Sequence, residues 1–452
     1  SVFSAFLVVT NSSFFNAKNQ IVKTTRSGQA DTLFEYDQLG NQILSGLDLN
    51  ANGALDISGP DRVTESASAY EKDASNAWWR VSASAVYAAE SSALATTNSI
   101  QKTRLTGLAL TSDLGLLISE SVAIDILGNE TVSRGFVDRD AKKLTHNTHF
   151  PDSTNNAVSV QVNGLTRSAT GKTGHTTTYG YDTLERQVAV TDPRTGTSVT
   201  HFNAVGQVDW TEDAATNRTS FAYDPATGRR IATTNALGSA AHVQFDVKGN
   251  TVAKWGTDYP VLQEFDDFNR QSALYTYRGE SPVSSYSDLL DAKPSMDKTT
   301  WLYDPATGLM TNKLYADGKG PTYTYTPDSK LLARTWARLM TNGQPLVTSY
   351  VFTNTTGELI GIDYSDGTPD VAFAFDRLGQ HTTVTDGAGT RTFTYNDALQ
   401  LASETNVMGV IAREYDSQGR ASALALRSLG EAGSAPYSVA YGFDGVGRFS
   451  SI

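Results

Sequence analysis

Residues 375–420 read FDRLGQHTTVTDGAGTRTFTYNDALQLASETNVMGVIAREYDSQGR, and one short pattern occurs in this stretch three times. Each copy has an aromatic residue, then Asp or Asn, then a glycine or a polar residue a few positions later. The copies begin at Phe375, Tyr395 and Tyr415, twenty residues apart. Regular spacing of this kind is the sequence signature of a repeat protein. The repeat therefore decides the fold class before length or composition does.

The same pattern recurs over most of the 452 residues. Between residues 181 and 265 its aromatic positions are 181, 202, 223, 245 and 265, so the spacing stays at 20 to 22 residues. Longer gaps after residues 265 and 325 indicate insertions at loops. We predict that the following side chains are the structural anchors of the repeat: Tyr36, Asp37, Gly40, Tyr181, Asp182, Tyr223, Asp224, Gly228, Phe245, Asp246, Gly249, Tyr303, Asp304, Gly308, Phe375, Asp376, Gly379, Tyr415, Asp416, Gly419, Phe443, Asp444 and Gly447.

Each copy of the pattern predicts a β-hairpin. Apolar and polar residues alternate before the Asp, as in TFTY at 392–395, which is the period of a strand with one buried face. The Asp side chain can accept hydrogen bonds from backbone amides ahead of it, and Gly supplies the positive φ of a tight turn. The alternation resumes after the turn, as in QVAVT at 187–191. One repeat is therefore a strand, a turn and a second strand.

Many such hairpins in tandem predict an all-β fold. An isolated hairpin is only marginally stable in water, so the units must pair edge to edge in a continuous ribbon. Three segments are expected: N-terminal β repeats over residues 1–60, a less regular β segment over 61–120, and a regular repeat array over 121–452 that continues the preceding part.

Composition excludes several classes of protein. The formal net charge is -12 without long runs of like charge, which disfavours a nucleic-acid partner. Cysteine is absent, so disulfide scaffolds and thiolate metal sites are excluded. The longest apolar run, Val2–Val9, is far shorter than the about 20 residues of a membrane span, and it predicts a strand.

With these residues the chain resembles the YD-repeat, or Rhs-repeat, family, whose namesake dipeptide occurs here at residues 36, 181, 223, 303 and 415. Members of that family form a long β-ribbon that spirals into a large hollow shell, in bacterial toxin complexes, polymorphic toxins and teneurin-like ectodomains. The resemblance implies a ribbon that spirals into a shell or an extended repeat assembly. It also implies a secreted or cell-surface scaffold that encloses a toxin or another cargo.

Toxin members of that family end the shell in a plug domain that cleaves itself with aspartates. The DPxGL signature of that plug is not matched here, because DPATGL at 304–309 has one residue too many. We therefore assign no catalytic residue, and the aspartates of the repeat share one structural explanation. The chain is expected to be a section of a longer array, with any cargo outside this sequence.

Residues 48–56 read DLNANGALD and match the first part of a calcium-binding loop. Oxygen-bearing side chains at the first, third and fifth positions, with Gly at the sixth, can wrap one cation. The usual Glu at the twelfth position is replaced by Gly59. The alternative is a loop that uses Asn and Asp for turns only, and both interpretations stay open. The candidate calcium ligands are Asp48, Asn50, Asn52, Asp56 and Asp61.

The favoured function is a non-catalytic structural scaffold, with no cofactor other than calcium. A second hypothesis is an extracellular adhesin or filament-forming protein that binds carbohydrate through Trp side chains such as Trp78 and Trp79, although these more often pack against a sheet. A glycan-active enzyme on the same scaffold is the third hypothesis. The partners predicted are therefore an enclosed cargo, a cell-surface or extracellular molecule such as a glycan, and further copies of the chain.

Overall fold

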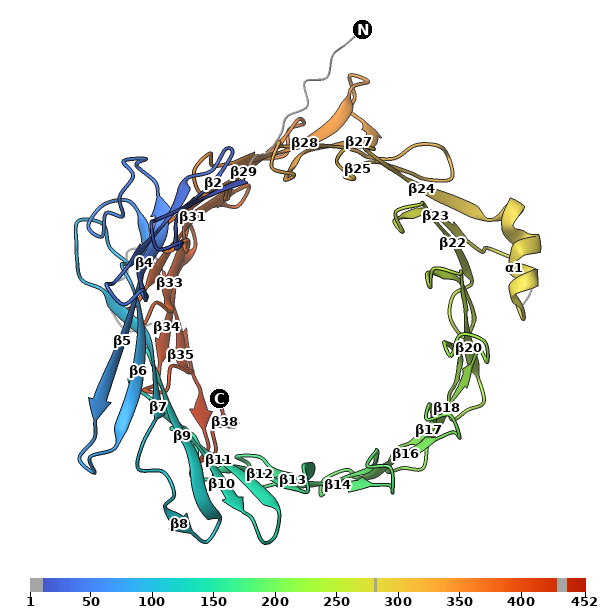
Figure 1. The fold of residues 1–452 in the computed structure, drawn as a ribbon. Helices are drawn as coiled ribbons and strands as arrows, with labels where there is room; N and C mark the ends of the chain where they lie inside the picture. The colour runs from blue at the N-terminus through green and yellow to red at the C-terminus, as the bar shows by residue number, and fades with distance from the viewer. Residues whose placement is uncertain (1–10, 280–282, 429–436) are drawn as a thin grey trace. The chain divides into compact units, whose positions relative to one another are not determined.

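The computed structural model describes residues 11–279, 283–428 and 437–452, so the expected strand Val2–Val9 lies outside the described residues. The chain divides into two units: residues 1–175 and 349–452 form unit 1, and residues 176–348 form unit 2. In the described part the only α-helix is α1 (Tyr286–Ala292), followed by the short 3-10 helix η1 (Lys293–Ser295) (Figure 1). No helix there is long and apolar enough to span a membrane.

The first part of unit 1, residues 11–175, is called the N-strip. Its strands form antiparallel hairpins with their neighbours in sequence, and β9 also pairs with β7. Several of these strands are longer than elsewhere, with 11 residues in β5 and in β9. The strands are β1 (Asn11–Phe15), β2 (Ile21–Arg26), β3 (Asp31–Tyr36), β4 (Gln42–Asp48), β5 (Arg62–Lys72), β6 (Trp78–Val86), β7 (Thr96–Arg104), β8 (Thr111–Ser112), β9 (Gly115–Asp125), β10 (Glu130–Asp138), β11 (Lys143–His149), β12 (Ala157–Val162) and β13 (Leu165–Thr170).

The second part of unit 1, residues 349–452, is called the C-strip. Its strands are also antiparallel and pair in sequence order from β29 to β36. The strands are β29 (Leu359–Tyr364), β30 (Val371–Phe375), β31 (His381–Asp386), β32 (Gly389–Tyr395), β33 (Leu401–Asn406), β34 (Gly409–Tyr415), β35 (Ala421–Arg427), β36 (Tyr437–Ala440), β37 (Gly442–Phe443) and β38 (Phe449–Ser451). The preceding strand β28 (Pro345–Phe352) spans the boundary between the units.

Unit 2 contains the most regular hairpins, with strands of four to nine residues. They are β14 (Thr176–Tyr181), β15 (Gln187–Asp192), β16 (Gly196–Phe202), β17 (Val208–Glu212), β18 (Arg218–Tyr223), β19 (Arg230–Thr234), β20 (Ala240–Phe245), β21 (Thr251–Gly256), β22 (Val261–Phe265), β23 (Gln271–Thr276), β24 (Asp297–Tyr303), β25 (Met310–Leu314), β26 (Thr322–Tyr325) and β27 (Leu331–Leu339). The predicted all-β fold of tandem hairpins is confirmed.

A β-bulge occurs at the aromatic anchor of each hairpin. In β34 and β35, for example, Glu414 is opposite Ala423 but Tyr415 is opposite Ala421, so the register shifts by one residue between them. The same shift occurs at Tyr36, Tyr223 and Phe375. A bulge increases the local twist of the strand and re-aims a side chain. The repeat therefore includes a bend that period-two alternation alone does not predict.

The turns alternate between the two edges of the ribbon, because successive strands run antiparallel. We call the A edge the one that carries turns 37–41 in the N-strip, 182–186 in unit 2 and 376–380 in the C-strip. The B edge carries the intervening turns, such as 49–61 in the N-strip and 407–408 in the C-strip. Most turns that follow an aromatic anchor lie on the A edge.

Two small apolar cores pack against the ribbon. In unit 2, helix α1 places Leu289, which is fully buried, against Trp255 and Tyr275 of β21 and β23. The helix begins at Ser285, whose hydroxyl accepts a hydrogen bond from the backbone N–H of Asp288 in a capping box. In the N-strip, a second core is formed by Leu33, Leu55, Val63 and Tyr87.

Candidate functional site

The turn at Asp416 is representative of the repeat. The backbone N–H groups of Gln418 and Arg420 each donate to Asp416 Oδ1 over 2.9 Å, and Arg420 Nε donates to Oδ2 over 2.8 Å. Both carboxylate oxygens are thus bonded within the turn itself. The same arrangement, with an Arg four residues after the Asp, is found at Asp182, Asp266 and Asp444.

These hydrogen bonds keep the turn carboxylates ionised. Burial raises the pKa of Asp416, but bonds from the side chain and backbone of Arg420 outweigh burial and lower that pKa below its ordinary value. The backbone N–H of Arg186 is the largest cause that lowers the pKa of Asp182. Hydrogen bonds from their own turns also lower the pKa values of Asp37, Asp213, Asp224 and Asp304.

The glycine near the end of the turn adopts a left-handed backbone. Gly419 has a φ of 75°, and positive φ values are also found at Gly40, Gly228, Gly249, Gly308, Gly379 and Gly447. Glycine is not obligatory, because Leu399 occupies the equivalent position with a φ of 60°. A non-glycine residue pays a steric cost in this region. Its side chain therefore has to be tolerated by the rest of the turn.

Tyrosine anchors such as Tyr415 tie their hairpin to the preceding one. The hydroxyl of Tyr415 donates to the backbone carbonyl of Leu401 over 2.8 Å, and Tyr223 donates to Val208 in the same way. Tyr36 donates to the carbonyl of residue 21, also over 2.8 Å. Burial raises the pKa of the equivalent Tyr303, Tyr325 and Tyr395. The ring is thus half-buried and the hydroxyl meets the backbone at the start of the previous strand.

A second tie between repeats comes from the residue that follows the glycine position. The side-chain amide of Gln400 donates to the carbonyl of Gly419 over 2.8 Å, and that of Gln207 donates to Gly228 over 3.0 Å. Where this residue is arginine, its guanidinium lies over the next aromatic anchor, as with Arg420, 4.2 Å from the ring centroid of residue 443. Sequence reasoning missed this tie. The signal was the polar residue that ends nearly every copy of the pattern.

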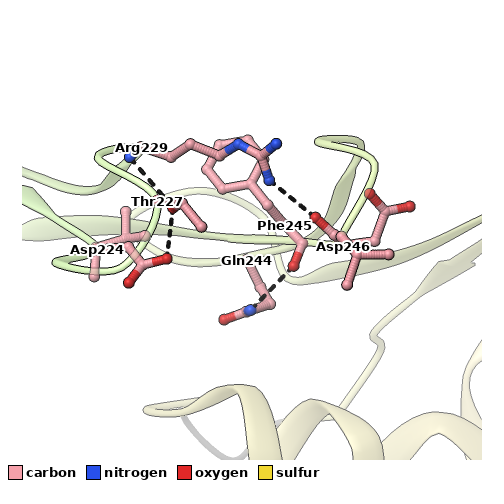
Figure 2. Close-up of a pocket in the computed structure, with 8 residues that line it drawn as sticks. Asp224, Thr227, Arg229, Gln244, Phe245 and Asp246 are labelled. Atoms are coloured by element: carbon pink, nitrogen blue, oxygen red, sulfur yellow. Dashed lines mark hydrogen bonds between the residues drawn. The ribbon is translucent and has the colours of Figure 1, made fainter.

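A pocket of about 530 Å³ lies between two neighbouring A-edge turns of unit 2 (Figure 2). Arg229 Nη1 donates to the carbonyl of Asp246 over 3.0 Å, and its guanidinium lies 5.7 Å from the ring centroid of Phe245. The hydroxyl of Thr227 donates to Asp224 over 2.6 Å. The first of these bonds joins the two turns, whereas the second lies within turn 224–229. The pocket is therefore the gap between two repeats, bridged by the arginine tie.

The C-strip docks on the N-strip through an ion pair. Arg62 donates to both carboxylate oxygens of Glu358, with Nη1–Oε1 at 2.7 Å and Nη2–Oε2 at 2.9 Å. Each side chain is 22% exposed. Burial raises the pKa of Glu358, but hydrogen bonds from Arg62 and Thr356 lower it below its ordinary value. The pair joins residues 296 positions apart in the sequence.

Arg377 is inserted more deeply into the N-strip and is 6% exposed. Its Nη1 donates to the carbonyls of Ile57 (2.8 Å) and Ala89 (3.0 Å), and Nη2 donates to that of Asp56 (2.9 Å). Its Nε donates to the carbonyl of Asp61. Burial lowers the pKa of Arg377, and the nearby Asp61 carboxylate opposes that shift. One guanidinium from an A-edge turn thus holds two B-edge loops.

Further turns continue this contact, which we call the junction. Asn129 Nδ2 donates to the carbonyl of Ser417 over 3.0 Å, and the backbone N–H of Thr154 donates to Gly445 over 2.8 Å. In each case an A-edge turn of the C-strip meets a B-edge turn of the N-strip. The junction therefore has a fixed polarity.

The candidate calcium ligands lie in one B-edge loop of the N-strip. Asp48 is 3% exposed and Asp61 is fully buried. The carboxylate of Asp48 accepts the backbone N–H groups at positions 52 and 53, over 3.1 and 2.8 Å. That of Asp61 accepts those at positions 49 and 56, over 2.8 and 2.9 Å. A pocket of about 390 Å³ beside the loop is lined by Asp48 and Thr355, among others.

The other three candidates converge within the same loop. The side-chain amides of Asn50 and Asn52 both donate to Asp56 Oδ2 over 2.7 Å. In the described part of the chain, no three His, Cys, Asp or Glu side chains lie close enough together to hold a metal ion. The loop is held closed by its own hydrogen bonds, and calcium binding stays a prediction.

Fold and turns together define a tandem β-hairpin repeat protein. No protein-family model and no curated protein matches the chain. Solved structures do: TcdB2-TccC3-TEV (11% identity, TM-score 0.39, 97% of this chain and 34% of that chain) and TcdB2-TccC3 without its hypervariable C-terminal region (12%, 0.39, 98% and 34%). The Photorhabdus luminescens Tc holotoxin pore matches at 12% identity and TM-score 0.32, over 98% of this chain. This chain spans about a third of their length, namely 34%.

Proposed function

We propose that this chain is a non-catalytic structural scaffold: a section of wall from a larger, secreted or cell-surface YD-repeat shell that encloses a toxin or another cargo. The observation that carries the proposal is the junction, where A-edge turns of the C-strip dock on B-edge turns of the N-strip. A single ribbon exposes the polar groups of its turns along both edges. Where one edge docks on another, two strips become one wider surface.

The junction contacts are strong enough to hold such a wall closed. Charge-assisted, bidentate pairs such as Arg62–Glu358 are about twice as strong as neutral hydrogen bonds. Arg377 is buried and donates to several backbone carbonyls, and each buried carbonyl left without a donor costs about 1–3 kcal/mol. These contacts favour a stable wall over strips that separate and rejoin.

The turn aspartates support the non-catalytic part of the proposal. Both carboxylate oxygens of Asp416 accept bonds from its own turn, and its pKa is lowered. A general acid or base works best with a pKa near the operating pH and within reach of a substrate. A lowered pKa and occupied oxygens suit a turn former instead.

Hydrogen–deuterium exchange of the whole chain tests the wall. Arg377→Met removes the guanidinium but keeps an unbranched side chain, so exchange should become faster in segments 49–61 and 376–380. Arg194→Met is the matched control, because Arg194 is exposed and bonds Asp192 within its own turn. Unchanged exchange in both segments of Arg377→Met would show that the junction does not hold the strips together, and the wall proposal would fail.

Enclosure of a cargo is tested separately, with a protease-sensitive polypeptide fused after Ile452. If the wall shields it, digestion should be at least about tenfold slower in the wild-type fusion than in the same fusion carrying Arg377→Met. If both fusions are digested at the same rate although the junction of the wild type is intact, the cargo role would be ruled out and only the scaffold role would stand.

Glycan binding is a second candidate function, favoured by exposed aromatic rings. Tyr70 and Trp78 are 64% and 41% exposed at the end of the long β5–β6 hairpin. Lys72 lies 5.0 Å from the centroid of the Trp78 ring. Exposed apolar groups that gather in this way mark interaction sites. Trp78→Ala should abolish binding on a glycan array without changing the melting curve, and a wild-type chain that binds no glycan would end this candidate.

A further inference from the structure

The hairpin of β5 and β6 continues beyond its pairing with β4 (Figure 1). β5 pairs with β4 only over residues 62–65, whereas its pairing with β6 continues to Lys72, which is opposite Trp78. On the other side of β6, strand β7 pairs with it as far as Arg104. We call residues 66–84 the arm. Its two sheet faces carry different kinds of side chain.

One face of the arm combines aromatic and basic side chains. Residues directly opposite each other in an antiparallel pair lie on the same face of the sheet. The register places Tyr70 opposite Arg80 and Lys72 opposite Trp78, two positions further along each strand. All four side chains are exposed. We call these four residues, Tyr70, Lys72, Trp78 and Arg80, the arm block.

The carboxylates at the end of the arm are engaged elsewhere. Glu71 is opposite Trp79 on the other face of the arm, and its carboxylate lies 3.8 Å from the ammonium of Lys102. Asp73 accepts a hydrogen bond from Trp79 Nε1 over 2.9 Å. Hydrogen bonds from Ser75 and Trp79 lower the pKa of Asp73, so this carboxylate stays ionised within its own turn. The face with the arm block therefore keeps its positive charge.

We propose that the arm block binds an anionic glycan, that is, a polysaccharide with carboxylate or sulfate groups. The two aromatic rings are diagonal neighbours in the block, and so are the two cations, each pair roughly 7–8 Å apart at the base. The C–H groups of a sugar ring can pack on an aromatic face, while Arg and Lys bind acidic oxygens by charge-assisted hydrogen bonds. This proposal deepens the second candidate function, glycan binding, and rests on it.

Hydroxyl side chains beside the arm block favour a glycan over a lipid surface. Ser68 and Ser82 are opposite each other, and Thr103 of β7 is opposite Arg80. All three hydroxyl residues are exposed. A hydroxyl can donate to and accept from the hydroxyls of a sugar, but it would lose its hydrogen bonds with water among acyl chains. The surroundings of the block therefore suit a ligand that is itself rich in hydroxyls.

The arm block lies on a sheet face and not on an edge of the ribbon. The two strips of unit 1 meet at the junction through turns, as Arg377 does with loop 49–61. The arm block contributes no residue to these contacts. Binding at the arm block therefore requires no free edge of the ribbon.

Binding of the whole chain to immobilised polysaccharides tests the proposal. Hyaluronan supplies carboxylates, heparin supplies sulfates, and dextran is the neutral control. The wild type should bind at least one of the two anionic polymers at least about tenfold more tightly than dextran. Its binding should weaken as the salt concentration rises from about 0.05 M to about 0.5 M. Equal affinity for dextran would overturn the anionic assignment and leave glycan binding in place. No binding to any of the three polymers would end both, and the wall proposal would stand on its own test.

Substitutions locate the bound glycan. Arg80→Gln and Tyr70→Ala, both at exposed positions, should each weaken binding at least about fivefold without changing the melting curve. Arg194→Gln removes the same charge from a turn of unit 2 and should bind like the wild type. Wild-type affinity in both Arg80→Gln and Tyr70→Ala would show that the glycan binds elsewhere, and the proposal would be wrong.

Two further probes separate a glycan from charge alone. Polyglutamate and vesicles of phosphatidylserine carry negative charge without a polysaccharide, so both should bind more weakly than the anionic polysaccharide. If either binds equally well, the arm block recognises negative charge and not a glycan, and the proposal fails.

Discussion

The regular hairpins of unit 2 and the junction of unit 1 are held by contacts that differ greatly in sequence separation. In unit 2, Asp182 is bonded by an arginine four residues later, and Tyr223 bonds a carbonyl 15 residues earlier. At the junction, Arg62 and Arg377 bind partners between 288 and 321 residues away. Residues that recur in every copy therefore build each hairpin, whereas residues at the variable positions of the repeat, such as Arg377, and in the loops between repeats decide which turns dock.

Of the substitutions that test this difference, Arg377→Ala should lower the stability most. It removes the guanidinium that donates to the carbonyls of Asp56, Ile57 and Ala89, and the lost hydrogen bonds should lower the free energy of unfolding by about 3–5 kcal/mol. Urea denaturation measures this loss. Arg194→Ala, which removes an exposed arginine from an ordinary turn, should cost less than about 0.5 kcal/mol. Equal losses would erase the distinction between the junction and other turns.

Calcium should strengthen the junction, because loop 49–61 supplies three of the four carbonyls that Arg377 binds. At a free calcium concentration of 100 times Kd, a bound ion adds about 2.7 kcal/mol. We expect a chelator to lower the melting temperature of the wild type and not that of Asp48→Ala. Asp213→Ala, in a turn of unit 2, should keep the chelator response. If the chelator does not change the melting temperature of the wild type, the loop does not bind calcium and uses its Asn and Asp side chains for turns only.

Within the hairpins, Tyr415→Ala should cost about 2–3 kcal/mol, because the half-buried ring and its bond to Leu401 are both lost. Tyr415→Phe keeps the ring and should cost about 1 kcal/mol. Chemical denaturation separates the two variants. Tyr70→Ala, at a 64% exposed position, is the control and should behave like the wild type. Equal losses in Tyr415→Ala and Tyr415→Phe would mean that the ring contributes nothing.

A double-mutant cycle on Arg62 and Glu358 measures the ion pair itself. We expect a coupling free energy of about 1–2 kcal/mol, because the pair is bidentate and partly buried. The same cycle on Arg218 and Glu212, where the arginine side chain is 51% exposed, should give about 0.5 kcal/mol or less. Equal couplings would show that burial at the junction adds nothing to the pair.

Lowering the pH is expected to have the smallest effect on stability. The turn aspartates have pKa values below the ordinary 3.8, so their contribution to stability is complete above that pH and is lost as the pH falls through the lowered values. Thermal melts between pH 6 and pH 2 should be flat above about pH 5 and fall below about pH 4. Asp213→Asn should reduce the slope at low pH slightly. A slope at low pH steeper than that of the wild type would contradict this assignment.

The hairpin repeat could be predicted because its chemistry is local. Asp416 and Gly419 act within one turn, and the alternation of apolar and polar residues before and after them locates the two strands. The sequence pattern of one repeat is therefore sufficient to predict its hairpin. The bond from Gln400 to Gly419 had a visible signal in the polar residue that ends the pattern. Its partner could not be identified without the strand register, which the bulge at each anchor shifts by one residue.

The junction could not be predicted from the pattern. Arg377 occupies a position that is Thr183 in one repeat and Val247 in another, and nothing nearby in the sequence singles it out. Its carbonyl partners become available only when the C-strip meets the loop at 49–61 and the segment around Ala89. The candidate calcium ligands could be recognised from the sequence as one set. The hydrogen bonds among them could not, because residue spacing does not determine the directions of the side chains.

The hydroxyl of Tyr303 reaches the carbonyl of Gln271 over 2.8 Å, 32 residues earlier, where other anchors reach back 14 or 15. The difference is the excursion that contains α1, and β23 and β24 pair across it in regular register. The segment that contains α1 is thus accommodated at a turn, while the strand ladder on either side stays regular. The ribbon depends on the backbone pairing of its strands, so a turn can present a different segment to solvent without a change in that pairing.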